Sequence, residues 1–379
     1  MTKNLGVGII GCGNISTAYL QLSPLFRAIA VRAVADLNMD VARAKAAEFA
    51  VRAETVDDLL AADDIDIVVN LTIPAAHFEV SKAALDAGKH VYSEKPFVLS
   101  VAEGEILRTI AADRGLRVGS APDTWMGGAH QDARAAIDAG QFGDIVAGSA
   151  CVMSHGPESW HPNPDFFYAP GGGPILDLGP YYLNNLIQFL GPVASVAALA
   201  NAPMAERPIG SGDRAGQTVP VLTPTNIHAL LNFHSGATIT LSTSWDVWAH
   251  RHANMELYGT KGSLFVPDPN FFGGDVECAG VDGKIGPLAR SDHPFGIDNQ
   301  QDRNNGVMRA NYRAAGLADM AQAIAEDRPH RCSLEMSLHA VDVMLAILES
   351  GDTGKFVTPS TTCDRPAALS PDQARDLMI

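Results

Sequence analysis

The sequence lacks the features of a small secreted, a nucleic-acid-binding or a membrane-embedded protein. Its five cysteines are scattered and form no CxxC pair, which argues against a disulfide framework and a structural zinc site. Lys and Arg number 27 against 43 Asp and Glu, and the net charge of −16 offers no basic surface to phosphate backbones or anionic lipid. No apolar run could span a bilayer, and no signal-type segment precedes the first strand-like residues. We therefore expect a cytoplasmic protein that binds neither nucleic acid nor membrane.

The N-terminal third alternates short apolar segments with amphipathic ones. With 379 residues, 46% apolar and 18% charged, the chain has the composition of a globular enzyme and is long enough for two domains. The expected strands are Leu5–Ile10, Ala30–Ala35, Ile65–Leu71, Lys89–Tyr92 and Leu116–Val118, and the expected helices include Met39–Phe49, Ala75–Ala87 and Val101–Asp113. Strands that alternate with helices are typical of a parallel sheet covered on both faces. The pattern predicts an α/β, doubly wound Rossmann domain over residues 1–122.

The pattern changes over residues 123–379, for which we expect one α+β domain with a largely antiparallel open sheet. Here strands follow one another directly and their apolar residues alternate with a period of two. The expected strands are Asp144–Met153, Ser195–Asn201, Thr225–Phe233, Thr238–Trp245 and Met255–Leu257, and the expected helices are Ala129–Ala139, Leu178–Leu190, Tyr312–Ala325 and Ser333–Glu349. An open sheet face usually needs a cover, so we expect a homodimer or homotetramer formed through this sheet.

A glycine-rich turn follows the first expected strand. Gly11-Cys12-Gly13-Asn14-Ile15-Ser16 is a G-x-G-x-x-G arrangement whose third glycine is replaced by Ser16. The first glycine makes the tight turn, the second lets the backbone approach a pyrophosphate, and the helix N-terminus holds its charge. Asp36, at the end of the second strand, would accept hydrogen bonds from ribose hydroxyls and repel a 2′-phosphate. The motif predicts NAD as the cofactor, with NADP disfavoured. The alternative is a glycine-rich turn without a ligand.

Ser93-Glu94-Lys95-Pro96 follows the fourth expected strand. Ligands of an open parallel sheet lie at the carboxyl ends of its strands, so Lys95 should face the nicotinamide. A lysine that is shielded from water beside a cationic ring loses basicity, which suits it to exchange a hydroxyl proton. The alternative is a surface lysine before a turn proline.

A polar stripe is expected on the helix after residue 177. Asp177, Tyr181 and Asn184 recur at spacings of four and three, which places them on one face. The stripe is typical of a site wall, while an N-cap aspartate followed by half-buried tyrosines is the alternative. In the preceding loop, Trp160 could stack on the apolar side of a sugar ring while His161 reaches a hydroxyl; Trp160 could equally anchor the loop. We expect no metal, because His155 and His161 have no third ligand of a suitable type.

Taken together, these motifs resemble the Gfo/Idh/MocA oxidoreductases, named for glucose-fructose oxidoreductase and inositol dehydrogenase. The resemblance covers nearly the whole chain and includes the late stretch Tyr312–Met320. It implies NAD(P)-dependent oxidation or reduction of sugars and cyclitols with Lys95 in the catalytic centre. The predicted cofactor-binding residues are Gly11, Gly13, Asn14, Ile15, Asp36, Thr72, Pro74, His77, Glu94 and Lys95. The predicted substrate-binding residues are Lys95, Trp160, His161, Asp177, Tyr181 and Asn184.

The sequence departs from the family pattern at two positions of the stripe. Many members read Asp-x-Gly-x-His-x-x-Asp, whereas this chain has Tyr181 and Asn184 in place of the histidine and the last aspartate. Tyrosine in this position resembles the dihydrodiol dehydrogenase and glucose-fructose oxidoreductase branch, in which it transfers the proton. A free phenol has a pKa of about 10, which nearby positive charge lowers. The resemblance thus implies Tyr181 as acid–base group, with Lys95 and Asp177 beside it in the catalytic set.

Three functions remain open from the sequence. The first is hydride transfer between nicotinamide and a hydroxyl-bearing carbon of a sugar, glycoside or cyclitol. The second is glycoside cleavage by transient oxidation and elimination, as in relatives on this fold that retain their NAD. The third is a non-catalytic sugar or dinucleotide sensor, which the presence of both Lys95 and Tyr181 disfavours. We expect a small sugar or polyol as the partner molecule in each case.

Overall fold

The contacts of the chain divide it into two compact units. The computed structural model describes residues 4–302 and 306–379. The first unit contains the residues up to Gly128 together with Asp292–Leu338 and Leu369–Ile379, and the second contains Ala129–Ser291 and His339–Ala368. The expected division put everything after residue 122 into one domain. The contacts instead assign two C-terminal segments to the unit that begins with the N-terminal strands.

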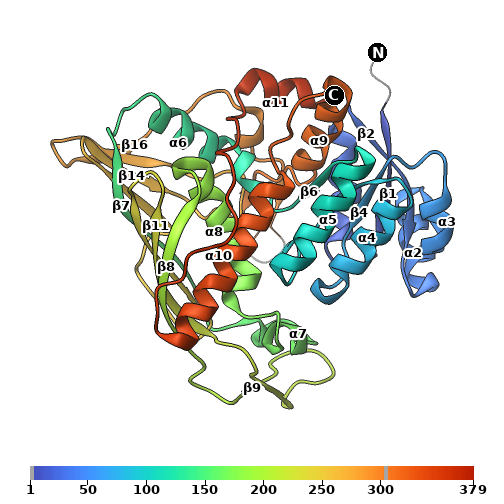
Figure 1. The fold of residues 1–379 in the computed structure, drawn as a ribbon, viewed down its shortest axis with the longest axis horizontal. Coiled ribbons are helices and arrows are strands. Elements are labelled where there is room, and N and C mark those ends of the chain that lie inside the picture. Colours follow the sequence, from blue (N-terminus) through green and yellow to red (C-terminus); the bar gives the residue numbers. More distant parts are fainter. Residues whose placement is uncertain (1–3, 303–305) are drawn as a thin grey trace. The chain divides into compact units, whose positions relative to one another are not determined.

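The first unit is built on a six-stranded sheet in the order β3-β2-β1-β4-β5-β6 (Figure 1). All neighbouring strands are parallel, which confirms the expected Rossmann sheet. The strands are β1 Leu5–Ile10, β2 Ile29–Ala35, β3 Arg52–Glu54, β4 Ile67–Asn70, β5 His90–Ser93 and β6 Val118–Ser120. Apart from the half-buried Leu5, the apolar side chains of β1 and β4 are buried. β1 and β4 are neighbours although β2 and β3 separate them in sequence, so the strand order reverses between them and opens a crevice for ligands.

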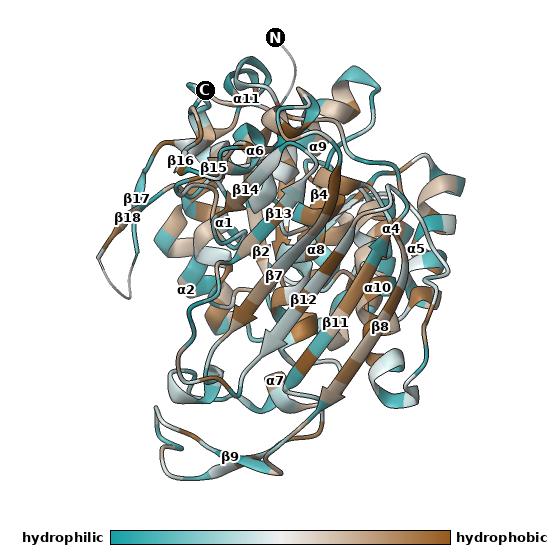
Figure 2. Ribbon diagram, turned by 90° about the vertical axis from the view of Figure 1, so that its left-hand side faces the viewer, coloured by the Kyte–Doolittle hydropathy of each residue, from teal (hydrophilic) through white to brown (hydrophobic). Residues whose placement is uncertain are grey.

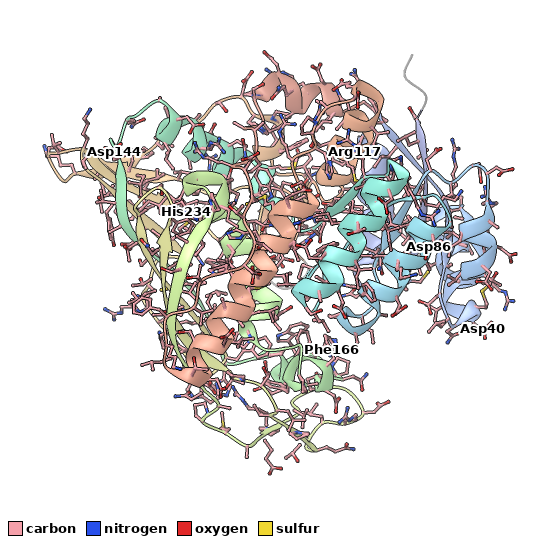
Figure 3. The ribbon with its side chains drawn as sticks, viewed as in Figure 1. Asp40, Asp86, Arg117, Asp144, Phe166 and His234 are labelled. Atoms are coloured by element: carbon pink, nitrogen blue, oxygen red, sulfur yellow. The ribbon has the colours of Figure 1, made fainter. Side chains whose placement is uncertain are left out.

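Helices cover this sheet and begin and end at recognisable residues. They are α1 Ser16–Leu22, α2 Met39–Phe49, α3 Val56–Ala61, α4 His77–Asp86, α5 Val101–Arg114, α9 Ala315–Glu326 and α11 Pro371–Leu377, with short 3-10 helices η1 Ser23–Leu25, η2 Pro74–Ala76, η3 Thr124–Met126 and η5 Pro294–Gly296. Ser100 and Glu103 form a capping box before α5, and Gly115 ends it in the left-handed region. Asp86 of α4, labelled in Figure 3, pairs with Lys82 on its own helix and with Arg114 of α5.

The C-terminal segments of the first unit pack on its N-terminal part. α9 contacts β2 and β6. Its Asp319 is fully buried and accepts hydrogen bonds from the Arg331 backbone at 2.7 Å and guanidinium at 2.6 Å. At the end of α11, the Leu377 carbonyl accepts from the Arg27 amide at 3.0 Å, and Phe26 bridges to Met378. The segment Tyr312–Met320 therefore contributes a structural carboxylate. A two-stranded pair, β17 Gln300–Gln301 and β18 Met308–Arg309, also belongs to this unit.

The second unit is built on an eight-stranded sheet in the order β16-β15-β14-β13-β7-β12-β11-β8. Its strands are β7 Ile145–Met153, β8 Val193–Asn201, β11 Asn226–Phe233, β12 Thr238–Ser244, β13 Met255–Gly259, β14 Gly262–Val266, β15 Glu277–Ala279 and β16 Ile285–Pro287, with a separate pair of β9 Glu206–Pro208 and β10 Thr218–Pro220. The expected antiparallel character is confirmed for every pair except β7 and β12, which run parallel.

The two faces of this sheet differ in their cover. α8 Pro174–Leu190 contacts β7, β11 and β12, and the side chains on that face are buried, as with Ile239 and Leu241. On the other face Leu199 is 75% exposed and Leu230 is 47% exposed. The register aligns Leu230 with Thr240 and Leu199 with His228, so these side chains share one surface, which we call the open face. Figure 2 shows β7, β12, β11 and β8 side by side.

A chain of buried hydrogen bonds joins α8 to α6 Gly128–Asp138. Gln131 donates to Gln188 at 3.1 Å, and Gln188 donates to Asn185 at 2.6 Å. Asn185 donates to His130 Nδ1 at 3.1 Å, and His130 Nε2 lies 2.8 Å from the Phe271 carbonyl oxygen. The four hydrogen bonds run in one donor-to-acceptor direction, from Gln131 to the Phe271 carbonyl oxygen, only if His130 is neutral with its proton on Nε2. The chain thus fixes the register of α8 through a neutral histidine.

The remaining helices of the second unit are short, apart from α10. They are η4 Pro157–Ser159, α7 Asp165–Tyr168 and α10 Leu334–Thr353, which begins in the first unit and continues in the second. Within residues 4–302 and 306–379, no helix combines the length and apolarity that crossing a bilayer requires.

The buried chain predicts an acid-dependent stability. Burial lowers the pKa of His130 to about 4, so between pH 6.5 and 4 the unfolded chain binds a proton that the folded chain does not. His130 should therefore lower the free energy of unfolding by on the order of 2–3 kcal/mol as pH falls through that range. In urea unfolding, His130→Gln should show a shallower pH dependence than the parent. His234→Asn, at the exposed β11–β12 turn (Figure 3), should leave it unchanged. Parallel curves for the parent and His130→Gln would contradict the assignment.

Candidate active site

The turn after β1 has the backbone that a dinucleotide loop requires. Gly11 has a φ of 101°, and a Cβ there would lie 2.6 Å from the Leu71 carbonyl oxygen. Only glycine fits, because the turn is left-handed and presses against the segment after β4. Gly13 has open space where its Cβ would point. The exposed Asn14 and half-buried Ile15 follow it, and Ile15 caps α1 without a side-chain hydrogen bond. The turn therefore leaves room for a phosphate group beside backbone amides.

Asp36 connects the end of β2 to this turn. Its carboxylate accepts the Cys12 amide at 2.9 Å and the Asn38 amide at 2.9 Å. Burial and the nearby Asp36 carboxylate raise the pKa of the Cys12 thiol to about 11, so the thiol is neutral beside the turn. The two residues after Asp36 are Leu37, which is 99% exposed, and Asn38. Asp36 thus shapes the glycine turn and presents its charge with no following arginine to neutralise a phosphate.

Asn70 supports several of the predicted cofactor residues, and it was not identified from the sequence. Its side chain is fully buried at the carboxyl end of β4, and its Oδ1 accepts the Thr72 amide at 3.2 Å and the Thr72 hydroxyl at 2.7 Å. Its Nδ2 donates to the His77 carbonyl at 2.9 Å and to the Ser81 hydroxyl at 3.0 Å. Asn70 therefore fixes the segment that carries the predicted residues Thr72, Pro74 and His77. A polar residue ending the apolar run Ile67–Asn70 is the sequence signal that could have identified it.

Glu94 and Lys95 lie at the carboxyl end of β5. Glu94 is 7% exposed, and its carboxylate accepts the Tyr19 hydroxyl at 3.1 Å and the Lys95 amide at 3.1 Å. Burial raises the pKa of Tyr19, so its phenol remains a neutral donor to Glu94. Burial also raises the pKa of nearby Asp123 to about 6, while its Oδ2 accepts the Gly316 amide at 3.0 Å. The half-buried Lys95 thus follows a backbone held by a buried carboxylate.

In the second unit, one helix carries the whole predicted stripe. α8 begins at Pro174, earlier than the expected Leu178, so Asp177, Tyr181 and Asn184 all lie within it and share one face. Asp177 is half-buried, Tyr181 is 6% exposed and Asn184 is 2% exposed. The Asn184 Oδ1 has no hydrogen-bond partner among the residues that the structure describes. A buried amide oxygen without a protein partner is suited to a ligand hydroxyl or a water.

The neighbouring Tyr182 is directed differently. Its hydroxyl accepts from Asn254 Nδ2 at 3.0 Å and lies 3.4 Å from the Asp268 carboxylate, and burial raises its pKa. The next helical residue is turned about 100° away from Tyr181. Tyr182 therefore belongs to the packing between α8 and the strands, and the two tyrosines are structurally distinct.

The predicted substrate loop is joined to the start of α8. Trp160 is 63% exposed and meets the His161 ring edge-on, with centroids 5.5 Å apart. His161 also contacts Phe166 of α7, which Figure 3 labels. The Phe167 carbonyl accepts the Gly173 amide at 2.7 Å, directly before α8. The structure thus connects Trp160 and His161 to the helix of Asp177, and leaves one ring face of Trp160 largely in solvent.

Arg207 is a second residue that the sequence did not reveal. Its guanidinium is 1% exposed and forms ion pairs with Glu158 of the loop at 3.1 Å and with Asp246 at 2.8 Å. It also donates to the Trp245 carbonyl at 2.5 Å. Because its partners lie far from it in sequence, no local pattern indicates this role. Arg207 holds the loop that contains Trp160 against the end of β12.

Two family models match the sequence of this chain. Residues 5–121 match the model of an oxidoreductase family with an NAD-binding Rossmann fold, and residues 130–265 match that of the Gfo/Idh/MocA C-terminal domain. Together the two models of this family cover more than half of the chain, and the resemblance and the NAD cofactor are confirmed.

Individual relatives agree. Levoglucosan dehydrogenase from Pseudarthrobacter phenanthrenivorans is 26% identical over 288 residues, 69% of this chain and 73% of that protein. A dTDP-3,4-didehydro-2,6-dideoxy-alpha-D-glucose 3-reductase from Streptomyces violaceoruber is 34% identical over 195 residues, 50% of this chain and 55% of that protein. A levoglucosan dehydrogenase structure with NADH and levoglucosan has the same fold, with a TM-score of 0.79 at 21% identity over 95% of this chain and 100% of that one. The chain belongs to the Gfo/Idh/MocA family of NAD-binding oxidoreductases.

Proposed function

We propose that this protein transfers hydride between NAD and a hydroxyl-bearing carbon of a sugar, glycoside or cyclitol. The observation that carries the proposal is the position of Lys95. It follows β5 at the same sheet edge at which Gly11 follows β1 and Asp36 follows β2. In such sheets the ligand lies along this edge, so a cofactor held at Gly11 and Asp36 extends toward the end of β5. The residues present fit NAD, because Gly13 leaves open space and Asp36 offers a carboxylate for ribose hydroxyls.

The proposed chemistry divides among four side chains. NAD, when bound, supplies the hydride acceptor or donor. Tyr181 takes the hydroxyl proton as the alcohol becomes a carbonyl and returns it in the reverse direction. Lys95 orients and polarises that oxygen. Asp177 fixes a neighbouring substrate hydroxyl or Lys95, and Asn184 offers its unpaired Oδ1 to a hydroxyl.

Sugar-like substrates are supported by the relatives and by the loop. The named relatives act on levoglucosan and on a dTDP-linked deoxysugar, as their names state. The exposed ring of Trp160 offers an apolar surface to the C–H face of a pyranose. The experiment is a screen of sugars and cyclitols, including levoglucosan, with NAD and NADP, followed by absorbance of the reduced cofactor. Turnover without NADH in solution would indicate retained cofactor and glycoside cleavage, and no turnover with any compound would refute the proposal.

We also propose that the open face joins two or more copies of this chain. Leu199 and Leu230 are exposed there, and Tyr258 of β13, which is 37% exposed, lies on the same face of the sheet. An exposed apolar sheet face is a common subunit interface.

Charge on the open face should therefore change the oligomeric state. Leu230→Glu should lower the sedimentation coefficient from that of an oligomer to that of a monomer, because the buried carboxylate would be unpaired. Leu222→Glu is the matched control, since Leu222 is 64% exposed in the β10–β11 connection, away from this sheet. A monomeric parent protein, or an unchanged Leu230→Glu oligomer, would refute the interface.

Asp36 should set the cofactor preference. Asp36→Asn keeps an oxygen for the Cys12 amide but removes the charge, so NAD should bind on the order of tenfold more weakly and the preference over NADP should narrow. Asp36→Ala should also narrow the preference for NAD over NADP, and it should remove the hydrogen bonds that hold the glycine turn. Dissociation constants for NADH and NADPH, measured by fluorescence, are the readout. Asp40→Asn, an exposed change on α2 (Figure 3), is the control. Equal affinity of the parent for both cofactors would contradict this role.

Tyr181 should be required for the proton transfer. Tyr181→Phe should leave NADH binding intact and lower kcat by a factor on the order of 10²–10⁴. Tyr182→Phe should lower kcat much less, because the Tyr182 hydroxyl accepts a hydrogen bond from Asn254. Lys95→Ala should cost at least as much as Tyr181→Phe, and the two effects should not add because the groups act as one unit. The pH–rate profiles of these variants are the measurement. If Tyr181→Phe keeps most activity while His161→Ala abolishes it, the base lies in the loop.

A further inference from the structure

His77 joins two turns of the first unit that carry predicted cofactor and catalytic residues. It is the first residue of α4, and its side chain is fully buried. Its Nδ1 lies 2.7 Å from the Pro96 carbonyl oxygen, and its Nε2 lies 2.9 Å from the Thr72 carbonyl oxygen. Thr72 follows β4, and Pro96 follows Lys95 after β5. Both polar atoms of the ring therefore face backbone of the protein, so these contacts favour an indirect role over a direct contact with cofactor.

Hydrogen bonds of Asn70 hold the backbone on both sides of the ring. The Asn70 side chain donates to the His77 backbone carbonyl at 2.9 Å and accepts from the Thr72 hydroxyl at 2.7 Å, which fixes one residue on each side of the Pro74–Ala76 turn. The Glu94 amide donates to the Asn70 carbonyl at 2.8 Å, so the same strand end also supports the turn of Lys95. His77 is the side chain that connects these two supported turns to each other.

The protonation state determines how complete this connection is. A neutral imidazole has one N–H and can donate to only one of the two carbonyl oxygens, while the protonated ring can donate to both. Burial lowers the pKa of His77, the two carbonyl contacts raise it, and the charged groups that face the ring act in opposite directions, Glu94 raising the pKa and Lys95 lowering it. A neutral ring must hold one turn more firmly than the other.

We infer that His77 is a positioning residue whose ring couples the Thr72 turn to the Lys95–Pro96 turn and so sets the position of the Lys95 amine. The inference deepens the proposed function and rests on the role proposed there for Lys95. It assigns separate consequences to the two ring nitrogens. The Nδ1 contact governs the turn of Lys95, and the Nε2 contact governs the turn of Thr72, which belongs to the predicted cofactor set.

Two isosteric substitutions separate these contacts. The Asn amide places a donor near the position of Nδ1, and the Gln amide places one near Nε2. His77→Asn should keep the Pro96 contact, so kcat should stay within about threefold of the parent while the NADH dissociation constant rises several-fold. His77→Gln should keep the Thr72 contact, so NADH binding should stay within about threefold while kcat falls about tenfold or more. His77→Phe should lose both contacts, so both kcat and NADH binding should fall.

A readout independent of turnover accompanies the kinetics. The rate at which acetic anhydride acetylates Lys95 reports the surroundings of the amine directly. The full chain is labelled with and without NADH, and the Lys95 peptide is then quantified by mass spectrometry after digestion. The rate should change in His77→Gln and not in His77→Asn. Melting temperatures should fall in both variants, because each loses one of the two buried contacts of the ring and part of its packing. If kcat, NADH binding and acetylation instead shift in parallel with the melting temperature in both variants, His77 has only a structural role and the inference is wrong.

The Lys95→Ala background distinguishes failure of the inference from failure of the proposed function. If His77 acts through Lys95, His77→Gln should cost nothing further in kcat once Lys95 is removed. Full additivity of the two changes would overturn the inference while leaving Lys95 catalytic. Parent-like activity of Lys95→Ala alone would refute the proposed function, and the acetylation rates would then still decide whether His77 positions the amine.

Discussion

In the turns that follow β1, β4 and β5, several backbone amides have no partner on a neighbouring strand. The structure of the first unit depends on the side chains that accept hydrogen bonds from these amides. A buried amide or carbonyl without a partner costs about 1–3 kcal/mol. Asp36 pairs the Cys12 amide, Asn70 pairs the Thr72 amide, and Glu94 pairs the Lys95 amide. The side chains that stabilise these turns therefore lie at the edge of the sheet where we propose that the cofactor binds. A substitution at any of them changes the shape of the site as well as its chemistry.

The second unit satisfies the same requirement with a different set of groups. The oriented amide chain that ends at His130 fixes α8, and the Arg207 guanidinium fixes the loop of Trp160 through Glu158. Breaking a buried ion pair by removing one partner costs about 3–5 kcal/mol, so Arg207 holds its loop firmly. Rigid support of this kind limits the positions that Asp177 and Tyr181 can take. Under the proposed function, discrimination between sugars would depend on groups whose orientation is set before binding.

The sequence predicts those parts of the fold and site whose determinants are local. The period of the apolar residues predicts the parallel sheet, and the glycine spacing with Asp36 at a strand end predicts the NAD site, because each signal lies within one βα unit. The spacing of Asp177 and Tyr181 places them on one helix, although the helix begins earlier than expected at Pro174. β3 was missed because it has only three residues.

What the sequence leaves out depends on contacts between distant residues. The ring of His77 meets Pro96, and Arg207 meets Glu158, across 19 and 49 residues of chain. His77 is among the predicted cofactor-binding residues, but no local pattern indicates its contact with Pro96, and a lone arginine such as Arg207 has no period or motif. The assignment of Asp292–Leu338 to the first unit is missed for the same reason. No local pattern indicates that this segment packs on the N-terminal strands or that Asp319 pairs with Arg331.

The pairing of Arg27 with Leu377 has a consequence for how the chain is made on the ribosome. Residues up to Gly128 emerge first, whereas α9, which packs on them, emerges after residues 129–291 of the second unit, and α11 emerges after all of that unit. Because domains otherwise tend to fold in order of synthesis, the first unit must wait with an incomplete core while the second is translated. The exposed surface of that waiting intermediate is where a chaperone would act. Truncation behind α10 should accordingly impair the nucleotide-binding half of the protein, although the lost residues lie at the opposite end of its gene.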